Sequence, residues 1–156
     1  MFSKKISTKL PSYNLFQAIY NDDLQTIISI LTQHPKIINS KDKKGDTPLT
    51  QACIFGNIEI VKFLLENNAS INSSNNCGHT PLINACKSGK FDIVKLLIKN
   101  NANVNLQDIG LRTLLMYACI SGESESLKAL LSNEEIKVHI KDTNGRTALH
   151  FACMYS

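Results

Sequence analysis

The sequence has no apolar run near the roughly 18 residues that a bilayer-spanning helix needs. Its first residues carry three lysines, yet they include no apolar block of the roughly 7 to 15 residues found in a secretory signal. Phe2 stands where N-myristoylation requires glycine. We therefore expect a protein that does not attach to a membrane and that is located in the cytoplasm, or alternatively in the nucleus.

The motifs of common enzyme classes are also missing. The sequence contains no G-x-x-x-x-G-K-[ST] phosphate loop, no H-E-x-x-H or C-x-x-C motif and no G-x-S-x-G nucleophile motif. Its 17 basic and 13 acidic side chains give a formal net charge of +4, a mild excess that is spread along the chain. We expect no catalytic residue, no cofactor, no metal and no nucleic-acid partner.

What the sequence does contain is a repeat. Four blocks that start with threonine follow one another at offsets of 33, 33 and 34 residues. They start at Thr47, Thr80, Thr113 and Thr147, and each reaches an alanine five residues later. A glycine and a second apolar segment follow the first three blocks. A fixed period of this size indicates a stacked array of supersecondary units.

The residues of one unit explain its local structure. The hydroxyl of Thr47 can accept from a free N–H of a first helical turn, and Pro48 needs no donor there, so we expect a helix to begin at Pro48. Gly56 permits the left-handed conformation that ends it. The small side chains of Ala52 and Cys53 allow neighbouring helices to approach closely. Such helices are shorter than the roughly 12 to 15 residues of a marginally stable isolated helix, so each unit must depend on its neighbours.

This pattern resembles the ankyrin repeat over almost everything that follows Tyr13. The resemblance implies an all-α repeat solenoid, in which stacked helix-turn-helix ankyrin repeats are joined by β-hairpin-like loops. The expected divisions are a flexible basic arm at 1–13, a degenerate N-terminal capping repeat at 14–41, ankyrin repeats at 42–74 and 75–107, an irregular repeat at 108–141, and a truncated repeat with only its first helix at 142–156.

Several positions depart from the pattern. Asp22 takes the place of the helix-ending glycine in the capping repeat, where polar residues such as Tyr20 interrupt the apolar pattern. Leu111 stands where Gly45 and Gly78 stand, so the third loop is expected to be shifted or strained. The last repeat stops where its second helix is due. We expect a fragment or a truncated relative of longer proteins; the alternative is that the first helix alone ends the array.

The cysteines occupy repeated positions. Cys53, Cys86, Cys119 and Cys153 each follow the alanine of a block, which should place them in successive layers about 8 to 10 Å apart. A disulfide requires Cα atoms within about 7 Å, so we expect a ladder of reduced, buried thiols, as is usual in cytosolic and nuclear proteins. Cys77 should be exposed at a loop tip. The four histidines stand at different repeat positions, and His150 is expected to bond its own turn.

In ankyrin-like proteins the partner usually docks on the concave side formed by the loop tips and the first helices. Carried over to this sequence, the resemblance implies these partner-binding residues: Lys43, Lys44, Asp46, Ile54, Phe55, Asn76, His79, Lys87, Ser88, Ile109, Arg112, Ile120, Ser121, Asn144, Arg146, Met154 and Tyr155. Phe55, Ile120 and Tyr155 are the expected anchors, because they are apolar where solvent favours polar residues. Alternatively, Phe55 and Ile120 pack against the neighbouring layer.

The expected function is a monomeric, non-enzymatic protein–protein interaction module with a protein partner whose identity the sequence does not indicate. Two alternatives remain open at this stage. The same face can serve a regulatory inhibitor of an enzyme, or the chain can be a structural spacer within a longer ankyrin array.

Overall fold

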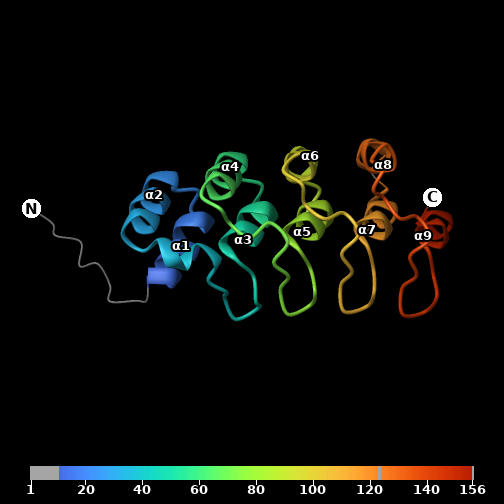
Figure 1. The fold of residues 1–156 in the computed structure, drawn as a ribbon, viewed down its shortest axis with the longest axis horizontal. Helices are drawn as coiled ribbons and strands as arrows, with labels where there is room; N and C mark the ends of the chain where they lie inside the picture. Colours follow the sequence, from blue (N-terminus) through green and yellow to red (C-terminus); the bar gives the residue numbers. More distant parts are fainter. Residues whose placement is uncertain (1–10, 123, 156) are drawn as a thin grey trace, which may run out of the picture.

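The computed structural model describes residues 11–122 and 124–155, with the side chains of residues 124–126 left out. Its helices form layers that stack in one direction, with an inner row, an outer row and loops that project away from the outer row (Figure 1). The inner helices are α1 (Pro11–Tyr20), α3 (Pro48–Phe55), α5 (Pro81–Lys87), α7 (Leu114–Ser121) and α9 (Ala148–Tyr155). The outer helices are α2 (Leu24–Gln33), α4 (Ile58–Glu66), α6 (Phe91–Lys99) and α8 (Ser124–Leu131), and the 3-10 helix η1 (Pro35–Asn39) follows α2. The all-α repeat architecture is therefore confirmed.

The loops that precede α3, α5, α7 and α9 are shaped like hairpins but contain no strand within the described residues. An isolated antiparallel bridge joins Gln107 and Thr113. The loops are closed by turn hydrogen bonds, such as the one that the Gly45 N–H donates to the Asp42 carbonyl at 3.0 Å. Backbone bonds also pair the two arms at the base, such as the one from the Asp42 N–H to the Asp46 carbonyl at 3.0 Å, so the loops are β-hairpin-like as the sequence predicts.

Helix α3 begins and ends as its sequence predicts. The Thr47 hydroxyl accepts from the Thr50 N–H at 3.2 Å, Pro48 takes the first helical position, and Gly56 ends the helix with φ 91°. Helix α7 lacks the proline, and no cap hydrogen bond forms from the Thr113 side chain. The N-terminal cap of the inner helix is therefore less complete in α7 than in α3, as the missing proline leads one to expect.

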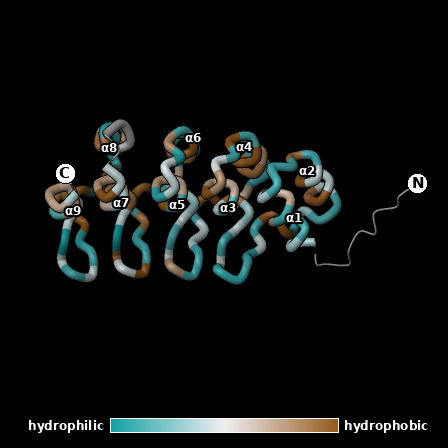
Figure 2. The backbone as a smooth tube through the Cα atoms, turned by 180° about the vertical axis from the view of Figure 1, so that it is seen from behind, coloured by the Kyte–Doolittle hydropathy of each residue, from teal (hydrophilic) through white to brown (hydrophobic). Residues whose placement is uncertain are grey.

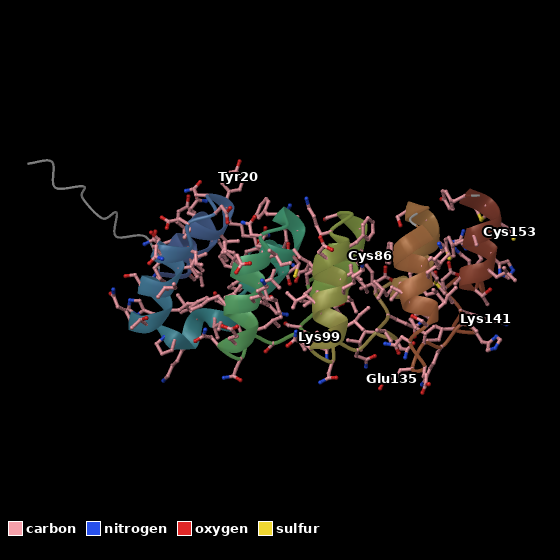
Figure 3. All side chains as sticks on the ribbon, turned by 90° about the horizontal axis from the view of Figure 1, so that it is seen from above. Tyr20, Cys86, Lys99, Glu135, Lys141 and Cys153 are labelled. Carbon is pink, nitrogen blue, oxygen red and sulfur yellow. The ribbon has the colours of Figure 1, made fainter. Side chains whose placement is uncertain are left out.

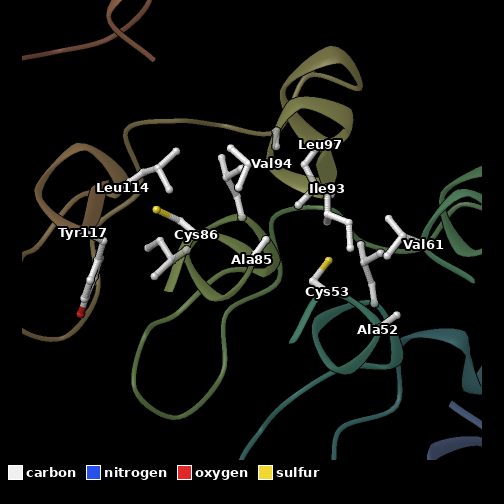
Figure 4. Packing of buried hydrophobic residues seen from close by; sticks show 14 of the residues in the cluster. Ala52, Cys53, Val61, Ala85, Cys86, Ile93, Val94, Leu97, Leu114 and Tyr117 are labelled. Atoms are coloured by element: carbon white, nitrogen blue, oxygen red, sulfur yellow. The ribbon is translucent and has the colours of Figure 1, made fainter. Parts of the chain in front are cut away.

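The core is continuous from layer to layer. Ala52, Cys53 and Val61 are completely buried, and Figure 4 shows them close to Ile93 of the next layer. Burying a side chain of the size of Val61 contributes roughly 1.5 to 3 kcal/mol. Because side chains of neighbouring layers share one core, a single layer has no core of its own.

The two ends of the stack correct two predictions. Helix α1 begins at Pro11, so residues 11–13 belong to the first layer and not to an arm; a proline suits the first helical position because it lacks the N–H that would be unpaired there. Residues 1–10, the rest of the predicted arm, lie outside the described residues. Cys153 is exposed whereas Cys53, Cys86 and Cys119 are buried, because no described layer packs on the far side of α9.

His150 bonds its own turn, as predicted. The Thr147 N–H donates to His150 Nδ1 at 3.2 Å, and the Thr147 hydroxyl lies 3.0 Å from the same nitrogen. The His150 imidazole thus bonds back from the helix to the backbone N–H of Thr147, the reverse direction to the bond that the Thr47 hydroxyl accepts in α3.

The third projecting loop is strained where the sequence lacks a glycine. Leu111 has φ 57°, in the left-handed region that a leucine rarely adopts. Ile109 and Leu111 are 74% and 45% exposed, and Figure 2 shows hydrophobic chain at the tip of this loop. The loop keeps the backbone path of its neighbours, so the strain is concentrated at one residue.

Replacing Leu111 with glycine should stabilise the protein. The left-handed conformation costs leucine roughly 1 to 2 kcal/mol, and the extra freedom of glycine in the unfolded chain offsets part of the gain. We expect Leu111→Gly to raise the free energy of unfolding by about 1 kcal/mol, measured by urea denaturation. Ile109→Gly, in the same tip but without a positive φ, is the control and should not stabilise. A Leu111→Gly variant no more stable than the parent contradicts the strain.

Candidate protein-binding surface

One side chain at the base of each projecting loop fixes its shape. In the first loop, Asp42 Oδ1 accepts from the backbone N–H groups of Lys44 at 2.8 Å and Asp46 at 2.9 Å. Equivalent pairs of bonds recur in the next three loops, and they are made by Asn75, Asp108 and Asp142. In such Asx turns a short polar side chain replaces a backbone partner. All four loops therefore have the same geometry at their bases.

The sequence contained a signal for these four residues that reasoning from it missed. Each stands five residues before the threonine of its block, at the same offsets of 33, 33 and 34 residues. An Asp or Asn repeated at one position ahead of a helix start is typical of a turn with a side-chain bond.

The loops are also joined to one another. The N–H of Asn76 donates to the Lys44 carbonyl at 3.0 Å, and the N–H of Ile109 donates to the Cys77 carbonyl at 3.1 Å. The N–H of Thr143 then donates to the Gly110 carbonyl at 3.0 Å. One backbone hydrogen bond thus links each loop to the next, and the four tips form a continuous ridge.

This close approach explains a glycine at the tip. Gly45 has φ 79°, and a Cβ atom there would lie 2.8 Å from the Asn76 nitrogen. Gly145 has a similar φ of 75°, but no described atom lies within 4 Å of the position of its Cβ. Gly45 is therefore required both by its conformation and by the neighbouring loop, whereas Gly145 is required only by its conformation.

Two alanine substitutions separate these effects. Gly145→Ala should cost about 1 kcal/mol for the left-handed backbone alone. Gly45→Ala should cost at least about 1 kcal/mol more, because the added methyl group displaces the next loop. The free energies of unfolding of the two variants, from chemical denaturation, give the difference. Equal losses would show that the contact between loops contributes nothing.

A polar cluster lies at the middle of the ridge. The Tyr117 hydroxyl donates to Asp108 Oδ2 at 2.5 Å, and His79 Nε2 lies 3.2 Å from that hydroxyl and 3.5 Å from the same carboxylate oxygen. Lys87 Nζ lies 3.4 Å from His79 Nε2 and 4.9 Å from the centre of the Tyr117 ring. The cluster ties helices α5 and α7 to the loops in front of them.

The cluster holds its groups in defined protonation states. Burial, followed by the adjacent Lys87 ammonium, lowers the pKa of His79 below its ordinary value. Burial, followed by the bond to the Asp108 carboxylate, raises the pKa of Tyr117 to about 12. At neutral pH His79 is uncharged and Tyr117 is a donor, so Lys87 carries the exposed positive charge here.

His79 should make the protein less stable in mild acid. Its depressed pKa in the folded state means that the unfolded chain binds the proton first as the pH falls. The contribution of the uncharged His79 to the free energy of unfolding is therefore fully present above the ordinary pKa of 6.5 and is lost progressively below it. We expect His79→Gln to lose less stability than the parent between about pH 7 and about pH 5.5, by urea denaturation. The exposed His34→Gln variant is the control; equal losses in His79→Gln and the parent would contradict the assignment.

The predicted contact residues fall into three groups by exposure. Those exposed are Lys43, Lys44, Phe55, Asn76, Lys87, Ile109, Ser121, Asn144, Met154 and Tyr155. Those half-buried are Ile54, His79, Ser88, Arg112, Ile120 and Arg146. Asp46 alone is buried. We use the term loop-side surface for the exposed side chains of the loop tips and of the last turns of the inner helices.

Asp46 is wrongly predicted as a contact residue. It is 4% exposed, and its carboxylate accepts from Asn75 Nδ2 at 2.8 Å and from Gln51 Nε2 at 3.2 Å. The carboxylate lies inside the loop base, where it joins the first loop to the second. A partner on the surface has no access to it.

The two arginines are held by an aromatic ring. The guanidinium carbons of Arg112 and Arg146 lie 5.7 Å and 4.6 Å from the centre of the Phe151 ring, and Arg146 also pairs with Asp142 at 2.8 Å. Cation–π contacts of this kind restrict the side chains. Both arginines therefore contribute to the packing of α9 as well as to the surface.

The expected anchors differ in how much surface they offer. Ile120 is half-buried and packs against the core, which favours the alternative that it supports its neighbours. Phe55 is 39% exposed and contacts Tyr20 of the preceding layer edge to face, with ring centres 5.4 Å apart. Tyr155 is 54% exposed at the other end of the stack. Phe55 combines exposure with a fixed orientation.

A hollow of about 360 Å³ lies beside Phe55 at the N-terminal end of the loop-side surface. Its lining includes Tyr13, Phe16, Tyr20, Phe55, Lys43 and Lys44, with Asp42, Gln17 and Gln51. Residues 13, 16 and 20 share one face of α1 at helical spacing. Sequence reasoning had interpreted Tyr20 as a polar interruption of a capping repeat, and it missed this aromatic face.

The described residues contain no group of three His, Cys, Asp or Glu side chains that could hold a metal ion. Burial, with a smaller contribution from Cys119, raises the pKa of Cys86 to about 11, and burial also raises the pKa of Cys53. These thiols stay protonated and serve as small core residues.

A family model described as ankyrin repeats (3 copies) matches residues 15–108 and 106–156. The chain belongs to the ankyrin-repeat family. Ankyrin repeats are generally protein–protein interaction modules and are in general not enzymes. A comparison with curated proteins finds no match.

The family assignment agrees with the projecting loops and paired helices that the structure shows. In the described part of the chain, no helix is long and apolar enough to cross a bilayer.

Proposed function

We propose that this ankyrin-repeat protein is a non-enzymatic binding module that docks a partner protein on its loop-side surface. The observation that supports the proposal is the ridge of four loop tips. Asx turns shape each tip, and one backbone hydrogen bond links each tip to the next. Exposed apolar and basic side chains therefore stand on a backbone that needs little ordering when a partner binds, which favours affinity.

The surface comes from one copy of the chain, so a monomer suffices for binding. We place the protein in the cytoplasm or the nucleus because its five cysteines are unpaired, as is usual where thiols are kept reduced. Partner capture is the natural test, since the proposal requires no chemistry from the protein itself.

Two substitutions on the loop-side surface should weaken capture of a partner without unfolding the protein. Phe55→Ala removes a partly exposed anchor and Lys44→Glu reverses an exposed charge. We expect each to reduce the recovery of the captured partner by about tenfold, a loss near 1.4 kcal/mol. Recovery is measured by quantitative mass spectrometry of proteins retained by the immobilised chain.

Lys95→Glu is the matched control, because it makes the same charge change on the outer helix α6, where Lys95 is exposed. It should leave capture unchanged. Melting temperatures should fall by no more than a few degrees in all three variants. Docking on the loop-side surface would be contradicted if Lys95→Glu reduced capture as much as the other two variants, or if all three variants retained the partner fully. Full retention is the result expected of a structural spacer.

A further inference from the structure

The exposed carboxylates of the described residues lie away from the projecting loops, whereas exposed lysines occur both on the loops and on the outer helices. Exposed carboxylates among the described side chains lie at Asp22 and Asp23 in the turn after α1, Glu59 and Glu66 on α4, Asp92 on α6, and Glu134 and Glu135 after α8. None of them lies on the tip of a projecting loop or on an inner helix. Figure 3 shows Tyr20 at one long edge of the stack, whereas Glu135 lies at the opposite edge.

The carboxylates on the loop side have both oxygens engaged within the protein. Asp42 uses its first oxygen for the Asx turn and its second for Gln51 Nε2 at 3.2 Å. Asp108 uses its second oxygen for Tyr117, and Asp142 uses its second for Arg146. Asp46 is buried between two loops. Their negative charge is directed inward, which leaves Lys43, Lys44 and Lys87 as the exposed charges of this surface.

The aromatic hollow lies beside two of these lysines. Tyr20 and Phe55 are 66% and 39% exposed, and their rings meet at 82°, so they form an angled wall and not a flat platform. Lys43 and Lys44 line the same hollow. An apolar side chain can enter it while acidic neighbours on either side meet the lysines, so shape and charge together select a ligand.

We propose that the partner presents an acidic segment with one aromatic or large aliphatic side chain, which enters the hollow between α1 and the first projecting loop. The inference rests on the proposed function and specifies the chemistry of the partner. The acidic residues contact Lys43 and Lys44, and the segment continues along the ridge toward Lys87. The angled rings favour a peptide side chain over stacked bases, which prefer flat aromatic faces.

A library of random short peptides displayed on phage tests this with the full chain as target. Enriched peptides should have a net negative charge and share an aromatic or large aliphatic residue. Their affinity, measured with synthetic peptides by calorimetry, should fall about tenfold or more in the Lys43→Glu/Lys44→Glu double variant and weaken with added salt. Tyr20→Ala should weaken binding by about tenfold, whereas Leu131→Ala, which removes an exposed apolar side chain from the outer helix α8, should not.

Different outcomes separate this inference from the proposed function. If the enriched peptides are basic or uncharged and the Phe55→Ala variant binds them more weakly, the proposal of an acidic partner is overturned. Docking on the loop-side surface is then still supported. Binding that none of the variants affects would count against both proposals. Failure to enrich any peptide would overturn this inference, and partner capture then decides the proposed function by itself. A single-stranded oligouridine probe tests the nucleic-acid alternative. If the protein binds it in a salt-sensitive way and Tyr20→Ala abolishes that binding, the ligand of the hollow is a nucleic acid and not a protein.

Discussion

Short helices that share a core are the constraint on which this structure depends. The longest helices of the described chain have 10 residues, fewer than the roughly 12 to 15 at which an isolated helix becomes marginally stable in water. Ala52, Cys53 and Val61 are buried in a core that continues into the adjoining layers. Each layer therefore depends on its neighbours for its stability, and the shape of the loop-side surface follows from the stacking.

The projecting loops extend the same dependence to the surface. An aspartate or asparagine shapes each loop from within, and a backbone hydrogen bond attaches it to the next loop. The left-handed residue at the tip differs from loop to loop. Gly45 adopts this conformation without strain and avoids a clash with Asn76, whereas Leu111 adopts it with strain. The docking surface is thus built from the repeat, while its charge and its aromatic hollow come from residues that differ between repeats.

The sequence predicted the repeated features well because each has a local cause. Thr47 and Pro48 start a helix through contacts within one turn, and Gly56 ends it through its own backbone freedom. Apart from the Asx turns, whose cause is local, the features it did not predict arise from contacts across layers. Asp46 looks like an exposed loop residue, yet Asn75 of the next loop binds its carboxylate. Tyr20 looks like a polar interruption, yet it forms a wall of the hollow together with Phe55, which follows it by 35 residues.

The most direct test of the account is amide hydrogen exchange at Asn76, Ile109 and Thr143, measured residue by residue by NMR. These amides donate the bonds that join one loop to the next. The account predicts that they exchange slowly, at rates close to those of the buried inner helices, because they open only when layers separate. Exchange near the rate of an unstructured peptide, in a chain whose helices remain protected, would show that the loops move independently and that the ridge is not a preformed docking surface.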